Sequence, residues 1–137
     1  MSRIKDLIAR QRTEIEATAQ QSVDVVLGGE LVTLTFDRAL PDEWDALMVA
    51  NPPRQGAKSD AAVGYNAKAV SEAYPRVEAD GEKLDAETWA ELFSSLDSVN
   101  RNNVEVVIWG VNINDALVKL RELGKARADQ KQSWPAN

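Results

Sequence analysis

The stretch LPDEWDAL (residues 40–47) and the stretch LDAETWAELF (residues 84–93) decide most of the fold. Each opens with helix-starting residues: Pro41 precedes two acidic residues in the first, and Asp85 is suited to cap the second. In each stretch a Trp is followed one turn later by a Leu on the same helical face, Trp44 with Leu47 and Trp89 with Leu92. Both stretches therefore predict helices that bury an aromatic face.

The segment between these helices predicts the main core. Six of the eight aromatic residues lie between Phe36 and Phe93. Residues 52–64 lack periodicity and contain Pro, Gly, Lys, Ser and Asp, which predicts a long loop of the kind that is usually functional or mobile. Asn66 is expected to cap a short helix over residues 67–73. The expected core residues are Trp44, Leu47, Tyr65, Trp89 and Phe93.

The N-terminal third predicts a helix followed by a hairpin. Residues 2–20 fit an amphipathic helix with an apolar stripe, which either packs on the body or docks on a partner or a second copy. Residues 23–36 alternate between apolar and polar side chains around Gly28 and Gly29, which suit a tight turn. Two strands alone are marginal in water, so helices must cover the apolar face or another chain must extend the sheet.

The C-terminal third predicts two further helices. Residues 103–113 are rich in β-branched residues, but their apolar positions also fit one helical face, and helix is the narrowly favoured interpretation. Residues 114–128 predict a helix that loosens near Gly124, and its inward-facing residues are expected to be Leu117, Leu120 and Leu123. We therefore expect one α+β domain over residues 1–124, with a helical part of four to five short helices over 41–124 and a flexible tail over 125–137.

Composition bounds the function. At 137 residues with 44% hydrophobic and 28% charged residues, the chain should fold as one domain. It contains no Cys and no His, which excludes disulfides, thiolate nucleophiles, Cys-ligated zinc and imidazole catalysis. The acidic run from Glu78 to Glu87 lacks the spacing of a calcium loop. We expect no enzyme, no cofactor and no metal.

Charge disfavours nucleic acid as a partner. The net charge is −6, and residues 21–113 carry seven Lys/Arg against sixteen Asp/Glu. An acidic body repels phosphate backbones. No apolar run approaches the roughly 20 residues of a membrane span, and no secretory segment follows Met1, so we expect a cytoplasmic protein that does not bind membranes.

The order of several motifs resembles a known family. The order runs from Trp44-x-x-Leu47 through Asn51-Pro52-Pro53-Arg54, Gly56, Asp60, Gly64-Tyr65-Asn66 and Tyr74-Pro75 to the helix with Trp89. Over roughly residues 23–113 this order is similar to tail assembly chaperones of long-tailed actinobacterial phages, the lambda-like class made with and without a frameshifted extension. The β-branched segment at residues 104–113 departs from the Ala- and Leu-rich helix expected there.

The resemblance implies a non-enzymatic protein of the host cytoplasm. Such chaperones coat the tape measure protein before the tail tube polymerises, which makes the tape measure protein the expected partner, with the major tail tube protein and self-association as further options. The alternative is a structural tail component, such as a terminator, connector or tube-associated subunit. The expected partner-binding residues lie in the first helix, the proline loop and the tail: Ile4, Leu7, Ile8, Pro52, Pro53, Arg54, Tyr65 and Trp134.

Overall fold

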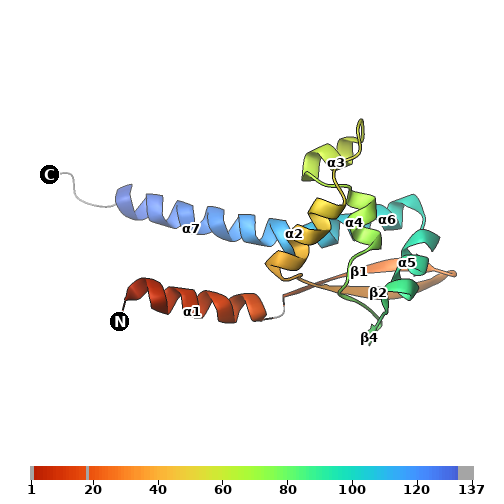
Figure 1. The fold of residues 1–137 in the computed structure, drawn as a ribbon, viewed down its shortest axis with the longest axis horizontal. Helices are drawn as coiled ribbons and strands as arrows, with labels where there is room; N and C mark the ends of the chain where they lie inside the picture. Colours follow the sequence, from red (N-terminus) through yellow and green to blue (C-terminus); the bar gives the residue numbers. More distant parts are fainter. Residues whose placement is uncertain (1, 18, 133–137) are drawn as a thin grey trace.

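The computed structural model describes residues 2–17 and 19–132, which form an α+β body with two helices projecting from one end (Figure 1). The N-terminal helix α1 (Arg3–Glu16) is followed by a hairpin of strands β1 (Gln20–Leu27) and β2 (Glu30–Asp37). Ser2 caps α1 by accepting a hydrogen bond from the backbone N–H of Lys5 at 3.2 Å. The hairpin turn uses Gly28 and Gly29 at φ of 60° and 81°, which confirms the predicted two-residue glycine turn.

The sheet is larger than the sequence predicted. Strands β3 (Val77–Ala79) and β4 (Glu82–Lys83) extend the hairpin into an antiparallel sheet of order β1-β2-β3-β4. Asp80 and Gly81 form the turn between them, with φ of 48° and 84°. The two strands were missed because two or three residues are too few to display an alternating pattern.

Helices lie on one side of this sheet and leave its other face to solvent. The inward strand positions carry Val25, Leu34 and Phe36, all fully buried. The outward positions pair polar side chains across the strands, with Ser22 bonded to Thr35 at 2.9 Å and Thr33 donating to Asp24 at 2.7 Å. The predicted inward and outward alternation of the hairpin is therefore confirmed, and it fixes which face the helices cover.

The helical part begins with three short helices: α2 (Pro41–Ala50), α3 (Lys58–Val63) and α4 (Ala67–Glu72). The predicted loop over residues 52–64 is wrong in its second half, because α3 forms there. A helix of six residues is too short to display an amphipathic period, so sequence gave no signal for it. Asn66 caps α4 as predicted, with its side chain accepting from the N–H of Ala69 at 3.1 Å.

Two further helices complete the body: α5 (Ala86–Ser95) and α6 (Ser98–Trp109), capped by the side chains of Asp85 and Asp97. The helix favoured over residues 103–113 is confirmed, although its last part is the π-helical turn η1 (Gly110–Asn114). From η1 the chain continues directly into α7 (Asp115–Gln132). The helix predicted over residues 114–128 is confirmed, but α7 passes through Gly124 without the expected loosening and continues to Gln132.

The core is one continuous chain of aromatic edge contacts. Ring centroids lie 5.2 Å apart for Tyr65 and Trp44, 6.5 Å for Trp44 and Tyr74, and 6.0 Å for Tyr74 and Phe36. Phe36 then meets Trp89 at 5.6 Å. Edge-to-face pairs of this kind contribute about 0.5–1.5 kcal/mol each beyond the area they bury. The predicted location of the core is therefore confirmed.

Candidate partner-binding surface

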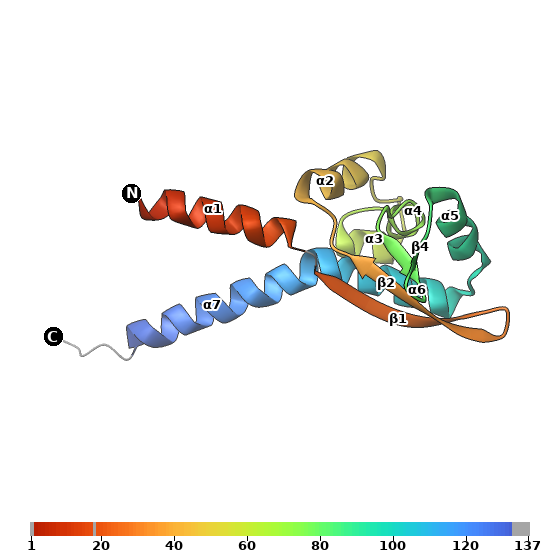
Figure 2. The ribbon, with the colours of Figure 1, turned by 90° about the horizontal axis from the view of Figure 1, so that it is seen from below.

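Helices α1 and α7 form a two-helix arm that projects from the body (Figure 1). The body is here residues 19–114. The two helices leave the same end of the body, run in opposite chain directions and separate towards their free ends (Figure 2). No residue of α1 is buried, and every α7 side chain from Asp115 to Gln130 is exposed. Exposed helices without a buried face are unusual, because most helical stability in proteins comes from packing an apolar face.

The root of the arm is fixed by side chains of the body. Arg38, just after β2, donates from Nη2 to the backbone carbonyls of Glu14 at 2.9 Å, Ile15 at 3.2 Å and Ala17 at 3.1 Å. A cation at these carbonyls complements the negative end of the α1 dipole. On the other helix, Gln21 of β1 donates to the Asp115 carboxylate at 2.9 Å. Side chains of the body therefore hold both helices at the end of the arm nearest the body.

A groove runs between the two helices. Its outer hollow, of about 470 Å³, is lined on one side by Ile4, Leu7 and Ile8 of α1 and on the other by Lys119 and Leu123 of α7. Its inner hollow, of about 620 Å³, continues past Ile15, Leu120 and Leu123 to the body. Leu123 lines both hollows and is 61% exposed. The groove is thus elongated and open to solvent, and both walls contribute aliphatic side chains interspersed with charged ones such as Glu14 and Lys119.

One ion pair spans the groove. Lys119 Nζ lies 4.0 Å from Glu14 Oε2, and both side chains are more than half exposed. An exposed pair at this distance contributes little stability, so it does not close the two helices on each other. The arm therefore has room between its helices for a further element.

The predicted contact residues separate into groups. Ile4, Leu7 and Ile8 lie in the groove. Pro52, Pro53 and Arg54 are exposed, but they precede α3 in a different part of the molecule (Figure 1). Tyr65 is 2% exposed and packs edge-on against Trp44, so its predicted contact role conflicts with its place in the core. Trp134 lies outside the described residues.

Sequence reasoning missed the α7 side of the groove. Leu117, Leu120 and Leu123 were expected to face inward, but they are 37%, 68% and 61% exposed. The leucine spacing was a usable signal, since it marks one helical face. It was assigned to the core because an apolar stripe is buried in most helices, whereas α7 extends beyond the body that would have covered it.

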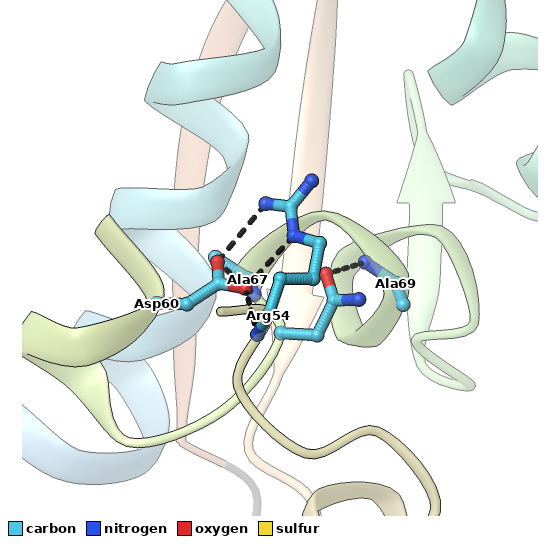
Figure 3. Close-up of polar contacts among 5 residues, drawn as sticks. Arg54, Asp60, Ala67 and Ala69 are labelled. Carbon is cyan, nitrogen blue, oxygen red and sulfur yellow. Dashed lines mark hydrogen bonds and ion pairs between the residues drawn. The ribbon is translucent and has the colours of Figure 1, made fainter. Parts of the chain in front are cut away.

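The loop between α2 and α3 (residues 51–57), which contains Pro52 and Pro53, is organised by a buried carboxylate (Figure 3). Asp60 is fully buried and accepts from the Nε of Arg54 at 2.8 Å, from its Nη2 at 3.0 Å and from its backbone N–H at 2.9 Å. The N–H of Ala67 donates to the same carboxylate at 3.1 Å. The Arg54 hydrogen bonds hold the pKa of Asp60 well below its usual range. The Asp60 carboxylate of α3 thus ties Arg54 of the loop to the first residue of α4.

Glu105 lies near this ion pair, and the pKa of its carboxyl is shifted in the opposite direction to that of Asp60. Partial burial raises the pKa of the Glu105 carboxyl, while the charge of Arg54 opposes the shift and that of Asp60 adds to it. Glu105 also lines a small hollow of about 100 Å³ with Tyr65 and Trp109. Within the described part of the chain, no group of three or more acidic side chains is placed to hold a metal ion.

Comparison with known proteins leaves the family open. No protein-family model, no curated protein and no solved structure matches this chain. In residues 2–17 and 19–132, no helix has both the length and the apolar character that crossing a bilayer requires. The geometry of the arm is therefore the basis on which a function can be assigned to this protein.

Proposed function

We propose that this protein is a phage tail assembly chaperone that binds the tape measure protein in the host cytoplasm and keeps it soluble until the tail tube forms. The observation that carries the proposal is the open apolar groove between α1 and α7. Proteins that hold helical segments of other chains commonly do so by laying an apolar helix face into such a groove. A tape measure protein is a long helical polypeptide that offers many such faces.

The shape of the groove suits binding that is reversible. Its walls are single helices, held to the body at the root through Arg38 and Gln21. Its walls present scattered aliphatic side chains such as Ile8 and Leu123, which are 47% and 61% exposed. Strong sites usually need fully desolvated central pockets, so weak contacts repeated along a long partner fit this geometry. A chaperone that tube subunits displace during assembly must release its partner, and weak contacts allow that release.

The motifs that resemble tail assembly chaperones and the residues that line the groove lie in different parts of the chain. The motif residues Trp44, Tyr65 and Trp89 are buried, so they support the fold of the body and not a contact. The groove lies almost entirely in α1 and α7, at the edges of the resembling segment or outside it. Binding is therefore assigned to the arm, and the acidic body keeps a coated polypeptide soluble through like-charge repulsion.

Co-expression with a tape measure protein tests the proposal. The expected result is that the tape measure protein stays in the soluble fraction and co-purifies with this protein. A Leu120→Glu substitution in the groove should abolish co-purification, whereas Val49→Glu should not, because Val49 is 83% exposed on α2 of the body. If an equimolar mixture neither associates nor delays aggregation, the proposal is wrong.

Analysis of finished phage particles separates a chaperone from a structural tail component. A chaperone is displaced during assembly, so mass spectrometry of purified virions should not detect this chain. Stoichiometric amounts in particles would instead assign it to the tail itself.

A further inference from the structure

Charge is divided between the two ends of the molecule. The distal arm, residues 3–12 and 119–132, carries nine Lys/Arg and three Asp/Glu, a net charge of +6. The remainder of the chain carries seven Lys/Arg and nineteen Asp/Glu, a net charge of −12. The electrostatic field of these charges steers an acidic partner towards the arm and repels it from the body. The basic end is also the end with the apolar groove.

The dimensions of the groove fit a rod. Its lining extends from Ile4 to Ala17 on α1 and from Asp115 to Leu123 on α7. The 14 residues of α1 span about 21 Å, which corresponds to about four helical turns of an occupant lying alongside. The apolar positions Ile4, Leu7, Ile8 and Ile15 recur at helical spacing, so an occupant with its own apolar face at the same spacing can pack against them.

A second copy of this chain fits the groove less well. Two arms that approach each other bring two charges of +6 together, which disfavours a bundle of paired arms. The opposite end of the molecule is acidic and exposes Val26 and Leu31 across the hairpin, with Val99 on α6 nearby. That end is a blunt hairpin tip (Figure 2), which would fill only a short part of an elongated groove.

We infer that the groove between α1 and α7 binds an amphipathic α-helix of about four turns whose apolar face is flanked by acidic side chains. This inference rests on the function proposed above and names the chemistry of the partner segment. The apolar face contacts Ile8, Leu120 and Leu123, while the acidic flanks meet basic residues of the two walls, among them Arg10 and Lys119. Segments with basic flanks are rejected by like-charge repulsion.

Two synthetic peptides test the inference on the full-length protein. Both are about 18 residues long with the same leucine positions at helical spacing, and their flanking positions are all Glu in one and all Lys in the other. Fluorescence anisotropy of the labelled peptides should show at least about tenfold tighter binding of the Glu peptide. The difference should shrink when NaCl is raised from about 50 to about 500 mM, because salt screens exposed charges.

Matched variants separate the groove from charge in general. Leu123→Glu should lower the affinity for the Glu peptide at least about tenfold, whereas Leu31→Glu, at the hairpin tip, should leave it unchanged. Arg10→Glu combined with Lys119→Glu, on the two walls of the groove, should remove the preference between the peptides. Lys58→Glu combined with Lys83→Glu changes the net charge equally but lies on the body, and it should keep the preference. Circular dichroism checks that each variant is folded.

Three outcomes would overturn the inference. The first is equal binding of the two peptides, or tighter binding of the Lys peptide. The second is self-association in sedimentation velocity that Leu31→Glu abolishes, which would make a second copy the occupant. The third is displacement of the Glu peptide by single-stranded DNA at low salt, which would make the basic arm a nucleic-acid site.

The inference and the proposed function can fail separately. If the peptides show no preference but Leu120→Glu still abolishes co-purification of the tape measure protein, the function stands and the acidic partner chemistry is wrong. If the Glu peptide binds as expected but the tape measure protein does not co-purify, the groove has the inferred specificity and the function is wrong.

Discussion

The guanidinium of Arg38 lies 2.9 Å from the backbone carbonyl oxygen of Glu14, and this contact joins the body to the last turn of α1. The same Nη2 also donates to the carbonyls of Ile15 and Ala17. These carbonyls have no partner within the helix, so a single side chain satisfies most of the exposed end of α1. The orientation of one wall of the groove thus depends on one residue of the body.

Replacing Arg38 with methionine should release α1 without unfolding the body. Methionine keeps much of the aliphatic volume but removes the charge and the donors, which is expected to cost α1 about 0.3–1 kcal/mol. Hydrogen exchange should therefore become faster at the amides of residues 3–16, while amides in β2 and α6 keep their protection. Lys5→Met, at the exposed free end of α1, is the control. Equal loss of protection in the body would contradict this assignment.

Replacing Asp60 with asparagine should destabilise the body. The neutral amide turns an N–H₂ group towards donors of Arg54 or Ala67, which leaves buried donors without an acceptor. Hydrogen bonds to a charged group are worth about 1.5–3 kcal/mol, so we expect a loss of about 2 kcal/mol in the free energy of unfolding, measured by urea denaturation. Ser59→Asn, on the exposed neighbouring position, should change it little.

The Asp60 carboxylate should also make the protein sensitive to acid. Its pKa in the folded state is depressed below the usual value of about 3.9, so the unfolded chain takes up a proton first as the pH falls. The stabilisation is complete above that usual value and is lost as the pH falls towards the folded-state pKa. Wild-type stability should therefore approach that of Asp60→Asn at low pH. Parallel stability curves across this range would contradict the prediction.

Glu105 should show the opposite pH dependence. Burial raises the pKa of its carboxyl above the usual value of about 4.3, so the ionised form at neutral pH costs stability. Protonation removes this cost as the pH falls through the folded-state pKa. At about pH 7 the Glu105→Gln variant should therefore be more stable than wild type, and this difference should disappear in acid. Glu87→Gln, on the exposed surface of α5, is the matched control in thermal melts.

Replacing Trp89 with phenylalanine should be costly. The Trp89 side chain is buried, donates from Nε1 to the carbonyl of Ser71 at 2.7 Å and packs against Phe36 and Phe93. The substitution removes the hydrogen bond and leaves a void, so we expect a loss of about 2–4 kcal/mol in the free energy of unfolding. Trp109→Phe should cost less, because Trp109 is only partly buried. Similar losses would argue against the central place of Trp89.

Local patterns predicted much of the body. The cap residues Asn66 and Asp85 act at the helix starts where the sequence predicted them. Capping and alternation depend on neighbours within a few residues, so one chain displays them. Strand β3 depends instead on pairing with β2, a contact between residues more than 40 positions apart in the case of Leu34 and Ala79, and β4 in turn pairs with β3. That pairing leaves no local pattern in so short a segment.

The groove shows most clearly which features follow from local sequence patterns and which depend on tertiary contacts. The sequence by itself determined that α1 and α7 are helices and that each has an apolar stripe, because helical spacing is a local property. Only the tertiary structure decided whether those stripes are covered. The π-helical turn at Gly110–Asn114 and the contacts of Arg38 and Gln21 direct both helices away from the body, so leucines that spacing alone assigned to a core line an open groove. Burial depends on what the rest of the chain places nearby, and no local pattern contains that information.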